Sequence, residues 1–164
     1  VLQSRTALVQ RDGDVVATDG VSPVLFSLSA GSYHIAVRHR NHFGVMTENP
    51  VTLSVTTSTV DFTSPAFGTY GTDAQKTVGA VRALWAGNVQ RDAILKYIGT
   101  SNDRDPILVR VGGNVPTNTV SGYYTEDVNL DGVVKYIGAS NDRDPVLVTI
   151  GGNTPNAVRS AQLP

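Results

Sequence analysis

The first 64 residues alternate short apolar runs with turn signals. In the clearest run, Tyr33, Ile35 and Val37 fall on one face of a strand, while His34 and Arg38 point to the other. Such runs, bounded by Asp-Gly and Ala-Gly turns, are typical of antiparallel strands. The expected strands are residues 6–10, 15–18, 24–28, 33–37, 51–55 and 59–62. Their spacing predicts a mainly β protein that opens with a small antiparallel β-sandwich, immunoglobulin-like or prealbumin-like, with a core of its own.

Residues 65–86 are expected to form a connector between this module and the rest of the chain. Three glycines interrupt the segment, at Gly68, Gly71 and Gly79. Within it, residues 76–85 fit a strand and a short helix equally well, so the pattern leaves this choice open.

An internal repeat with a period of 39 residues occupies residues 87–164. Residues 87–118 align without gaps with residues 126–157, and 18 of the 32 aligned positions are identical. Both copies contain the string Lys-Tyr-Ile-Gly-x-Ser-Asn-Asp-Arg-Asp-Pro, followed by Gly-Gly-Asn. Self-similarity of this extent indicates one structural unit in two copies that stack or pair with each other.

The second copy contains the string Asp-x-Asn-x-Asp-Gly, which is typical of a calcium-binding loop. Oxygen side chains at alternate positions wrap the cation, and the glycine permits the sharp turn. A standard loop of about 12 residues would end at Gly138, which has no side chain, so we infer a six-residue insertion over residues 135–140. The predicted Ca²⁺ ligands are Asp127, Asn129, Asp131, the carbonyl of Val133, Asn141, Asp142 and Asp144.

A short helix is expected directly after this loop, because Asp142 or Asp144 can cap it and Pro145 suits a first turn. Gly151 and Gly152 would end it. The β-branched residues between them leave a strand as the alternative.

The first copy departs from the loop pattern, because Ala93 stands where the second copy has Gly132. Its candidate ligands carry fewer charges, and calcium affinity falls with the number of carboxylates. We therefore expect a weaker or empty site. The candidate ligands of the first copy are Asn88, Asp92, Asn102, Asp103 and Asp105.

These loops resemble dockerin-type calcium-binding repeats with an insertion. More specifically, residues 32–164 resemble the C-terminal region of large secreted surface proteins of Gram-negative environmental bacteria. The matching strings are residues 33–46, residues 84–88 and both Asn-Asp-Arg-Asp-Pro sequences. The resemblance implies a place at the cell surface more firmly than it implies an activity.

Composition and motifs narrow the function classes further. A formal net charge of −1 without a basic patch argues against nucleic-acid binding, and no apolar run of about 18 residues could span a membrane. Cysteine is absent, and neither Gly-x-Ser-x-Gly nor a phosphate-binding loop occurs. We therefore predict that the chain is not an enzyme.

Several conspicuous residues are expected to be structural. The three histidines, which include His39 and His42, should be hydrogen-bonded or solvent-facing, and Trp85 should anchor a core or the contact between the two domains. The repeated tyrosines should pack between the copies while the adjoining lysines pair with acids. Arg104 and Arg143, each between two aspartates, should be ion-pair partners.

The sequence as a whole predicts a secreted, calcium-stabilised structural protein of the cell surface, either a self-assembling filament subunit or an adhesin module. Because the chain begins at Val1 and its only methionine is Met46, we expect a processed chain whose secretion signal has been removed. The expected partners are other copies of the chain or another surface protein. The alternatives are a dockerin-type recognition module, which would bind a cohesin-like partner around Arg110 and Thr149, and a carbohydrate-binding module near Trp85.

Overall fold

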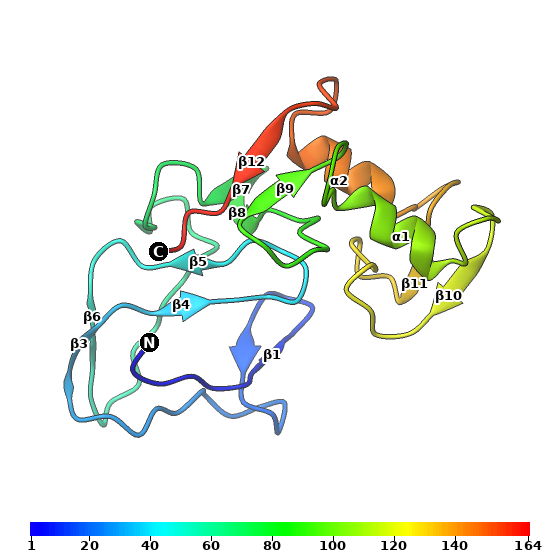
Figure 1. Cartoon of the computed structure of the whole chain (residues 1–164). Helices are drawn as coiled ribbons and strands as arrows, with labels where there is room; N and C mark the ends of the chain where they lie inside the picture. Colours follow the sequence, from blue (N-terminus) through cyan, green and yellow to red (C-terminus); the bar gives the residue numbers. More distant parts are fainter.

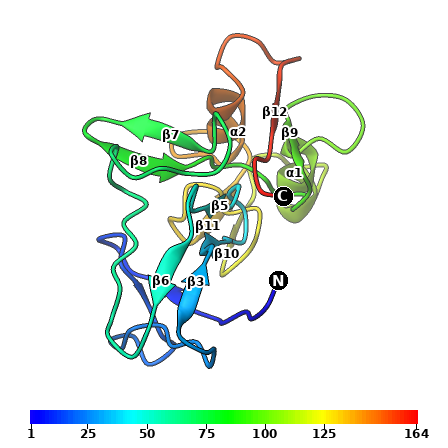
Figure 2. The ribbon, with the colours of Figure 1, turned by 90° about the vertical axis from the view of Figure 1, so that its left-hand side faces the viewer.

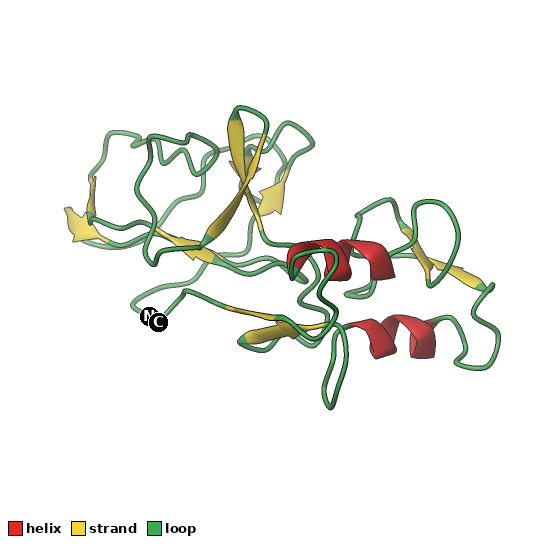
Figure 3. Ribbon diagram, turned by 90° about the horizontal axis from the view of Figure 1, so that it is seen from above, coloured by secondary structure: helices red, strands yellow, loops and turns green.

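The chain is mainly β with two short helices, and the computed structural model describes all of residues 1–164 (Figure 1). The strands form six separate two-stranded antiparallel sheets, and loops make up most of the chain (Figure 3). Neither helix has the length and apolar character needed to cross a membrane. The elements are β1 (Leu8–Val9), β2 (Val15–Val16), β3 (Gly31–Tyr33), β4 (Ala36–Val37), β5 (Val45–Met46), β6 (Val51–Leu53), β7 (Gln75–Val78), β8 (Val81–Leu84), β9 (Ile94–Lys96), α1 (Arg104–Arg110), β10 (Thr119–Ser121), β11 (Val133–Lys135), α2 (Arg143–Thr149) and β12 (Val158–Ser160).

Residues 1–64 contain three of the two-stranded sheets, β1–β2, β3–β6 and β4–β5. The Asp-Gly hairpin is confirmed, because Leu8 pairs with Val16 across the predicted turn. Figure 2 shows β3 and β6 side by side. That these sheets belong to a β-sandwich stays a prediction.

Two of the predicted strands, residues 24–28 and 59–62, are loops. In the loop of residues 24–28, side chains form hydrogen bonds with the backbone in place of a neighbouring strand. Arg5 donates from Nε to the Leu25 carbonyl at 3.0 Å, and the Ser27 amide donates to Gln3 Oε1 at 2.8 Å. Composition marks such a segment as β-prone, but a strand also needs a neighbouring strand that offers its backbone.

The expectation that residues 1–64 have their own core is wrong. No side chain before Asn41 is buried, and alternate residues from Asn41 to Thr47 are the only buried ones in this half. Phe43 is its only member of the central cluster of nine buried apolar side chains, and the other eight come from the repeat. The N-terminal half therefore joins the core of the repeat through Phe43 and has no comparable apolar cluster of its own.

In the connector, the residues that fitted both a strand and a helix are strands, because β7 and β8 form a hairpin. Its last residues join the two halves of the chain. The Phe43 amide donates to the Trp85 carbonyl at 2.9 Å, and His42 forms an isolated β-bridge with Ala86. The segment of residues 39–43 thus lies directly against the start of the repeat.

The two copies of the repeat are intertwined. Strand β9 of the first copy pairs with β12, which follows the second loop. Strand β11 of the second copy pairs with β10, which follows the first loop. Helix α1 packs on β11 of the second copy, and α2 packs on β9 of the first (Figure 1). The fully buried side chains at this crossing are Leu95, Ile107, Val134 and Val146.

Both helices are stabilised at their N-termini by an asparagine two residues before the first helical residue. The Asn102 and Asn141 side chains accept a hydrogen bond, at 2.9 Å each, from the amides of Asp105 and Asp144. This satisfies one of the orphan amides of the first turn. The predicted helix after Asp142 is confirmed, and the strand alternative is wrong. The prediction that Asp142 or Asp144 caps this helix is also wrong, because the Asn141 side chain makes the cap hydrogen bond.

Shortening Leu95 to alanine should destabilise the whole chain. Leu95 is fully buried in the cluster shared by both halves, so the cavity should lower the free energy of unfolding by about 2–5 kcal/mol. The matched control is Leu25→Ala, because Leu25 is 76% exposed and should change the value by less than about 0.5 kcal/mol. Urea unfolding followed by circular dichroism measures both. A second transition insensitive to Leu95→Ala would contradict the shared core.

Candidate functional site

The loop of the second copy winds its polar side chains around its own backbone amides. The Asp131 amide is shared between Asp127 Oδ1 at 3.1 Å and Asn129 Oδ1 at 2.8 Å. Asp127 Oδ2 accepts from the Gly132 amide at 3.2 Å, and Asp131 Oδ1 accepts from the Val133 amide at 2.9 Å. The structure thus brings the first three predicted ligand side chains together on one turn.

Asp142 closes this loop from the inside. Its side chain is fully buried, and its Oδ1 accepts from the amides of Val128 and Asn129 at 2.7 and 3.1 Å. Oδ2 accepts from the Lys135 amide at 2.8 Å. Burial is the main cause that raises the pKa of this carboxyl, although the three amides oppose it. Asp142 therefore ties the start of the loop to β11.

Asn141 and Asp144 lie at the helix start. Besides accepting from the Asp144 amide, Asn141 donates from Nδ2 to Asp144 Oδ2 and to the Gly138 carbonyl, at 2.8 Å each. Arg143 donates to the other oxygen of Asp144. The hydrogen bond from Asn141 is the leading cause that lowers the pKa of Asp144. These two residues organise the helix cap.

The first copy repeats this architecture with Asn88 in the place of Asp127. The Asn88 side chain accepts from the Asp92 amide at 3.1 Å and donates to the Asp92 carbonyl at 3.0 Å. It therefore accepts the same loop hydrogen bond that the Asp127 carboxylate accepts from Asp131 in the second copy. The buried Asp103 accepts from the amides of Gln90 and Lys96 at 2.9 Å each. Asn102 and Asp105 form the helix cap as in the second copy. These hydrogen bonds hold the shape of the first loop.

The donor set of the second loop fits a hard cation in part. Asp127, Asn129, Asp131 and the Val133 carbonyl offer carboxylate, amide and carbonyl oxygens, which calcium prefers. However, the carboxylates of Asp127 and Asp142 are occupied by backbone amides, and no three carboxylate or imidazole side chains are grouped so as to hold a metal ion. The Ca²⁺ assignments of both loops stay predictions.

Arg40 and Asn41, which the sequence analysis did not connect with the loops, join the N-terminal half to the second loop. Arg40 Nη2 lies 3.0 Å from Asp127 Oδ2. The Asn41 side chain is fully buried and donates to the carbonyls of Thr125 and Asp127 at 2.8 and 2.7 Å.

The backbone of Asn41 contacts the first copy at the same time. Its carbonyl accepts from the amides of Gly87 and Asn88 at 3.0 and 2.9 Å. Since Asn88 and Asp127 occupy equivalent repeat positions, one residue contacts corresponding points of both copies. No local motif signals this role, because the partners lie more than 40 residues away.

Most of the remaining candidates form the contacts that the sequence predicts, but Lys96 does not pair with an acid, because its Nζ donates to the Thr100 carbonyl at 2.7 Å. Arg104 and Arg143 pair with the aspartates that follow them, and Lys135 Nζ lies 3.8 Å from Asp131. His39 Nδ1 and His42 Nδ1 are hydrogen-bonded at 3.0 Å, and burial lowers the pKa of His42 to about 4. The histidines are therefore hydrogen-bonded, as expected.

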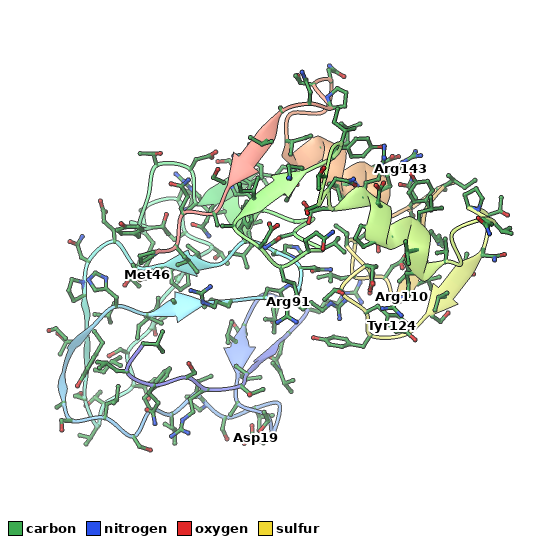
Figure 4. All side chains as sticks on the ribbon, in the orientation of Figure 1. Asp19, Met46, Arg91, Arg110, Tyr124 and Arg143 are labelled. Atoms are coloured by element: carbon green, nitrogen blue, oxygen red, sulfur yellow. The ribbon has the colours of Figure 1, made fainter.

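Two further side chains bear on the alternative functions. Arg159 lies over the Trp85 ring, with its guanidinium carbon 3.4 Å from the ring centre, and covers one face of it. Arg110 stacks on Tyr124 and pairs with Glu126, and Figure 4 shows Arg110 and Tyr124 together. Thr149 is buried and donates to the Ala86 carbonyl, so the expectation that it lies on a recognition face is wrong.

Asp103 should titrate far from its ordinary range. Burial raises its pKa from 3.8 to about 6, so its contribution to stability is fully present below pH 3.8 and is lost as the pH rises through about 6. Carboxyl NMR should place its midpoint near pH 6. The lowered pKa of His42 makes its own contribution to stability change with pH in the opposite direction. The free energy of unfolding in urea should therefore be compared between the wild type and Asp103→Asn at pH 4.5 and 7, because His42 is present in both. A midpoint below pH 4 would contradict the buried site.

Asn41→Ala should weaken the junction of the two halves. The carbonyls of Thr125 and Asp127 would lose a buried donor, which should lower the free energy of unfolding by about 2–4 kcal/mol. The control is Asn49→Ala, because Asn49 is exposed. Thermal unfolding monitored by near-UV circular dichroism compares the two variants. Equal melting temperatures in the two variants would show that the side-chain hydrogen bonds of Asn41 contribute nothing to the stability of the chain.

Comparisons with protein-family models, with curated proteins and with solved structures give no match. No relative therefore supplies a fold family or an activity for this chain. Its function has to be inferred from its own residues and their geometry.

Proposed function

We propose that this chain is a calcium-stabilised structural module of a secreted cell-surface protein and has no catalytic role. The observation that carries the proposal is the second loop, in which Asp127 and Asn129 share one backbone amide and Asp131 caps the next turn. This loop sits on a core that both copies and the N-terminal half share. A cation that holds the loop would therefore stabilise the chain as a whole.

Calcium would neutralise the loop's carboxylates and bind the side-chain and carbonyl oxygens of the loop. Asp127, Asn129, Asp131 and the Val133 carbonyl would hold it, while Asp142 keeps the loop closed from behind. Because a cation that binds only the folded chain stabilises it, calcium at about 100 times its dissociation constant would add roughly 2.7 kcal/mol. Extracellular modules work with dissociation constants of about 10⁻⁴ to 10⁻³ M.

Self-association, as a filament subunit or an adhesin module, is supported by the N-terminal segment. Its strands β1 and β2 form an isolated two-stranded sheet, and Leu8, Val9 and Val15 are exposed on it. Open strand edges and exposed apolar side chains favour pairing with another chain. Contact with a different surface of a second copy would produce an open filament.

A dockerin-type recognition module with a cohesin-like partner is the second candidate. It is supported by two equivalent surface groups at the helix starts, where Arg104 lies over Tyr97 and Arg143 lies over Tyr136. Ile98 and Ile137 are exposed beside the two tyrosines. Carbohydrate binding at Trp85 is less well supported, because Arg159 covers one face of the ring.

Calcium should raise the melting temperature of the wild-type chain. We expect a rise of several degrees between excess chelator and millimolar calcium, since roughly 1 kcal/mol corresponds to about 2–8 °C for chains of this size. Asp131→Asn should remove most of this rise, whereas Asp92→Asn, at the equivalent position of the first loop, should leave it. Differential scanning calorimetry gives both values. An unchanged melting temperature in calcium would contradict the calcium part of the proposal.

Self-association should depend on the exposed apolar hairpin. Light scattering at high protein concentration with calcium should detect assemblies in the wild type and a monomer in Leu8→Ser/Val9→Ser. The matched control is Ile98→Ser/Ile137→Ser, which alters the surface beside the helix starts and should assemble like the wild type. A monomeric wild type would contradict the assembly and favour the recognition module.

A further inference from the structure

Asp127, the first predicted ligand of the second loop, already has a cation from the N-terminal half. Arg40 Nη2 lies 3.0 Å from Asp127 Oδ2, and the Asp127 side chain is 3% exposed. Oδ2 also accepts from the Gly132 amide, and Oδ1 accepts from the Asp131 amide. The hydrogen-bonding capacity of this buried carboxylate is therefore largely used by groups of the chain itself.

Asp131, the other carboxylate on this turn, also faces a basic group. Its Oδ2 lies 3.8 Å from Lys135 Nζ, where both side chains are about one-third exposed. The pair between Arg40 and Asp127 is therefore the buried one, and the pair between Lys135 and Asp131 is the solvated one. Solvent screens the second pair strongly and the first pair little.

We propose that Arg40 is a built-in counter-cation that competes with a divalent cation for Asp127. The proposal rests on the calcium loop proposed above and names the residue that regulates it. Two positive charges cannot share one buried carboxylate without strong repulsion, because the surroundings screen them poorly. With Arg40 in place, the N-terminal half is tied to the second loop; with a cation in the loop, this tie is released.

The surroundings of Arg40 allow its release. Its Nε is buried without a hydrogen-bond partner, which makes the bound position costly. Its guanidinium carbon lies 3.9 Å from the centre of the Tyr123 ring, and Tyr123 is 83% exposed. Arg40 already stacks on this exposed ring in its paired position, so a small outward movement can break the ion pair while the stacking contact is kept.

The release of Arg40 leaves the rest of the junction intact. Asn41 binds the carbonyls of Thr125 and Asp127 and does not touch the carboxylate. Its own carbonyl keeps the amides of Gly87 and Asn88. The two halves therefore stay packed while one charge contact changes.

The test compares calcium affinity in Arg40→Met and in the wild type by isothermal titration calorimetry. Removing the competing charge should lower the calcium dissociation constant at least about tenfold. Arg110→Met is the matched control. It removes one positive charge beside Glu126, the residue next to Asp127, but no contact with Asp127, so its affinity should change less than about threefold.

A second measurement uses the wild type alone and does not depend on the folding of the variant. The side-chain Nε–H signal of Arg40 in an NMR titration should shift as calcium is added, whereas that of Arg110 should stay in place. Chelator should restore the original Arg40 signal.

The outcomes separate the two proposals. If calcium binds but Arg40→Met leaves its affinity unchanged or weaker, or if the Arg40 signal does not move, the competition is wrong and the calcium loop stands. If calcium binds neither the wild type nor Arg40→Met, both the calcium loop and the competition are wrong. Tighter binding by Arg40→Met alone supports both.

Discussion

The fold depends on one buried asparagine where three segments of the chain meet. The Asn41 side chain donates to two carbonyls at the start of the second loop, those of Thr125 and Asp127, and its backbone carbonyl accepts from the amides that open the first. Phe43 follows it into the core, which the N-terminal half otherwise does not reach. Because buried polar groups must find partners, these bonds fix how residues 39–43 sit on the double repeat.

Inside each copy of the repeat, a buried carboxylate accepts backbone hydrogen bonds that a longer strand ladder would accept in a larger sheet. The strands are only two to four residues long, so their own hydrogen bonds are few. Asp103 and Asp142 add bonds from the start of each loop to the strand that follows. The asparagine caps then begin a helix that crosses to the other copy. The polar residues shared by the two copies are therefore largely architectural, even where they resemble metal ligands.

The two loops share this architecture and differ in charge. The second carries Asp127 and Asp131, each facing a basic residue, whereas the first carries Asn88 in the position of Asp127. If the second loop binds calcium as proposed, the duplicated module would have one loop that responds to the cation and one, with Asn88 in place of Asp127, that binds it more weakly.

The sequence by itself determined what local chemistry and duplication can specify: the mainly β class, the Asp-Gly hairpin, the repeat and the ion pairs of Arg104 and Arg143, whereas it left the helix after the second loop open against a strand. Turn residues, caps and neighbouring charges act over a few positions, so their pattern is legible in the chain. Only the tertiary structure decided that residues 24–28 and 59–62 are loops, that residues 1–64 lack a core, and that Arg40 and Asn41 meet Asp127. These outcomes depend on which distant segment supplies a partner. Burial and backbone pairing are properties of the packed molecule and not of any one segment.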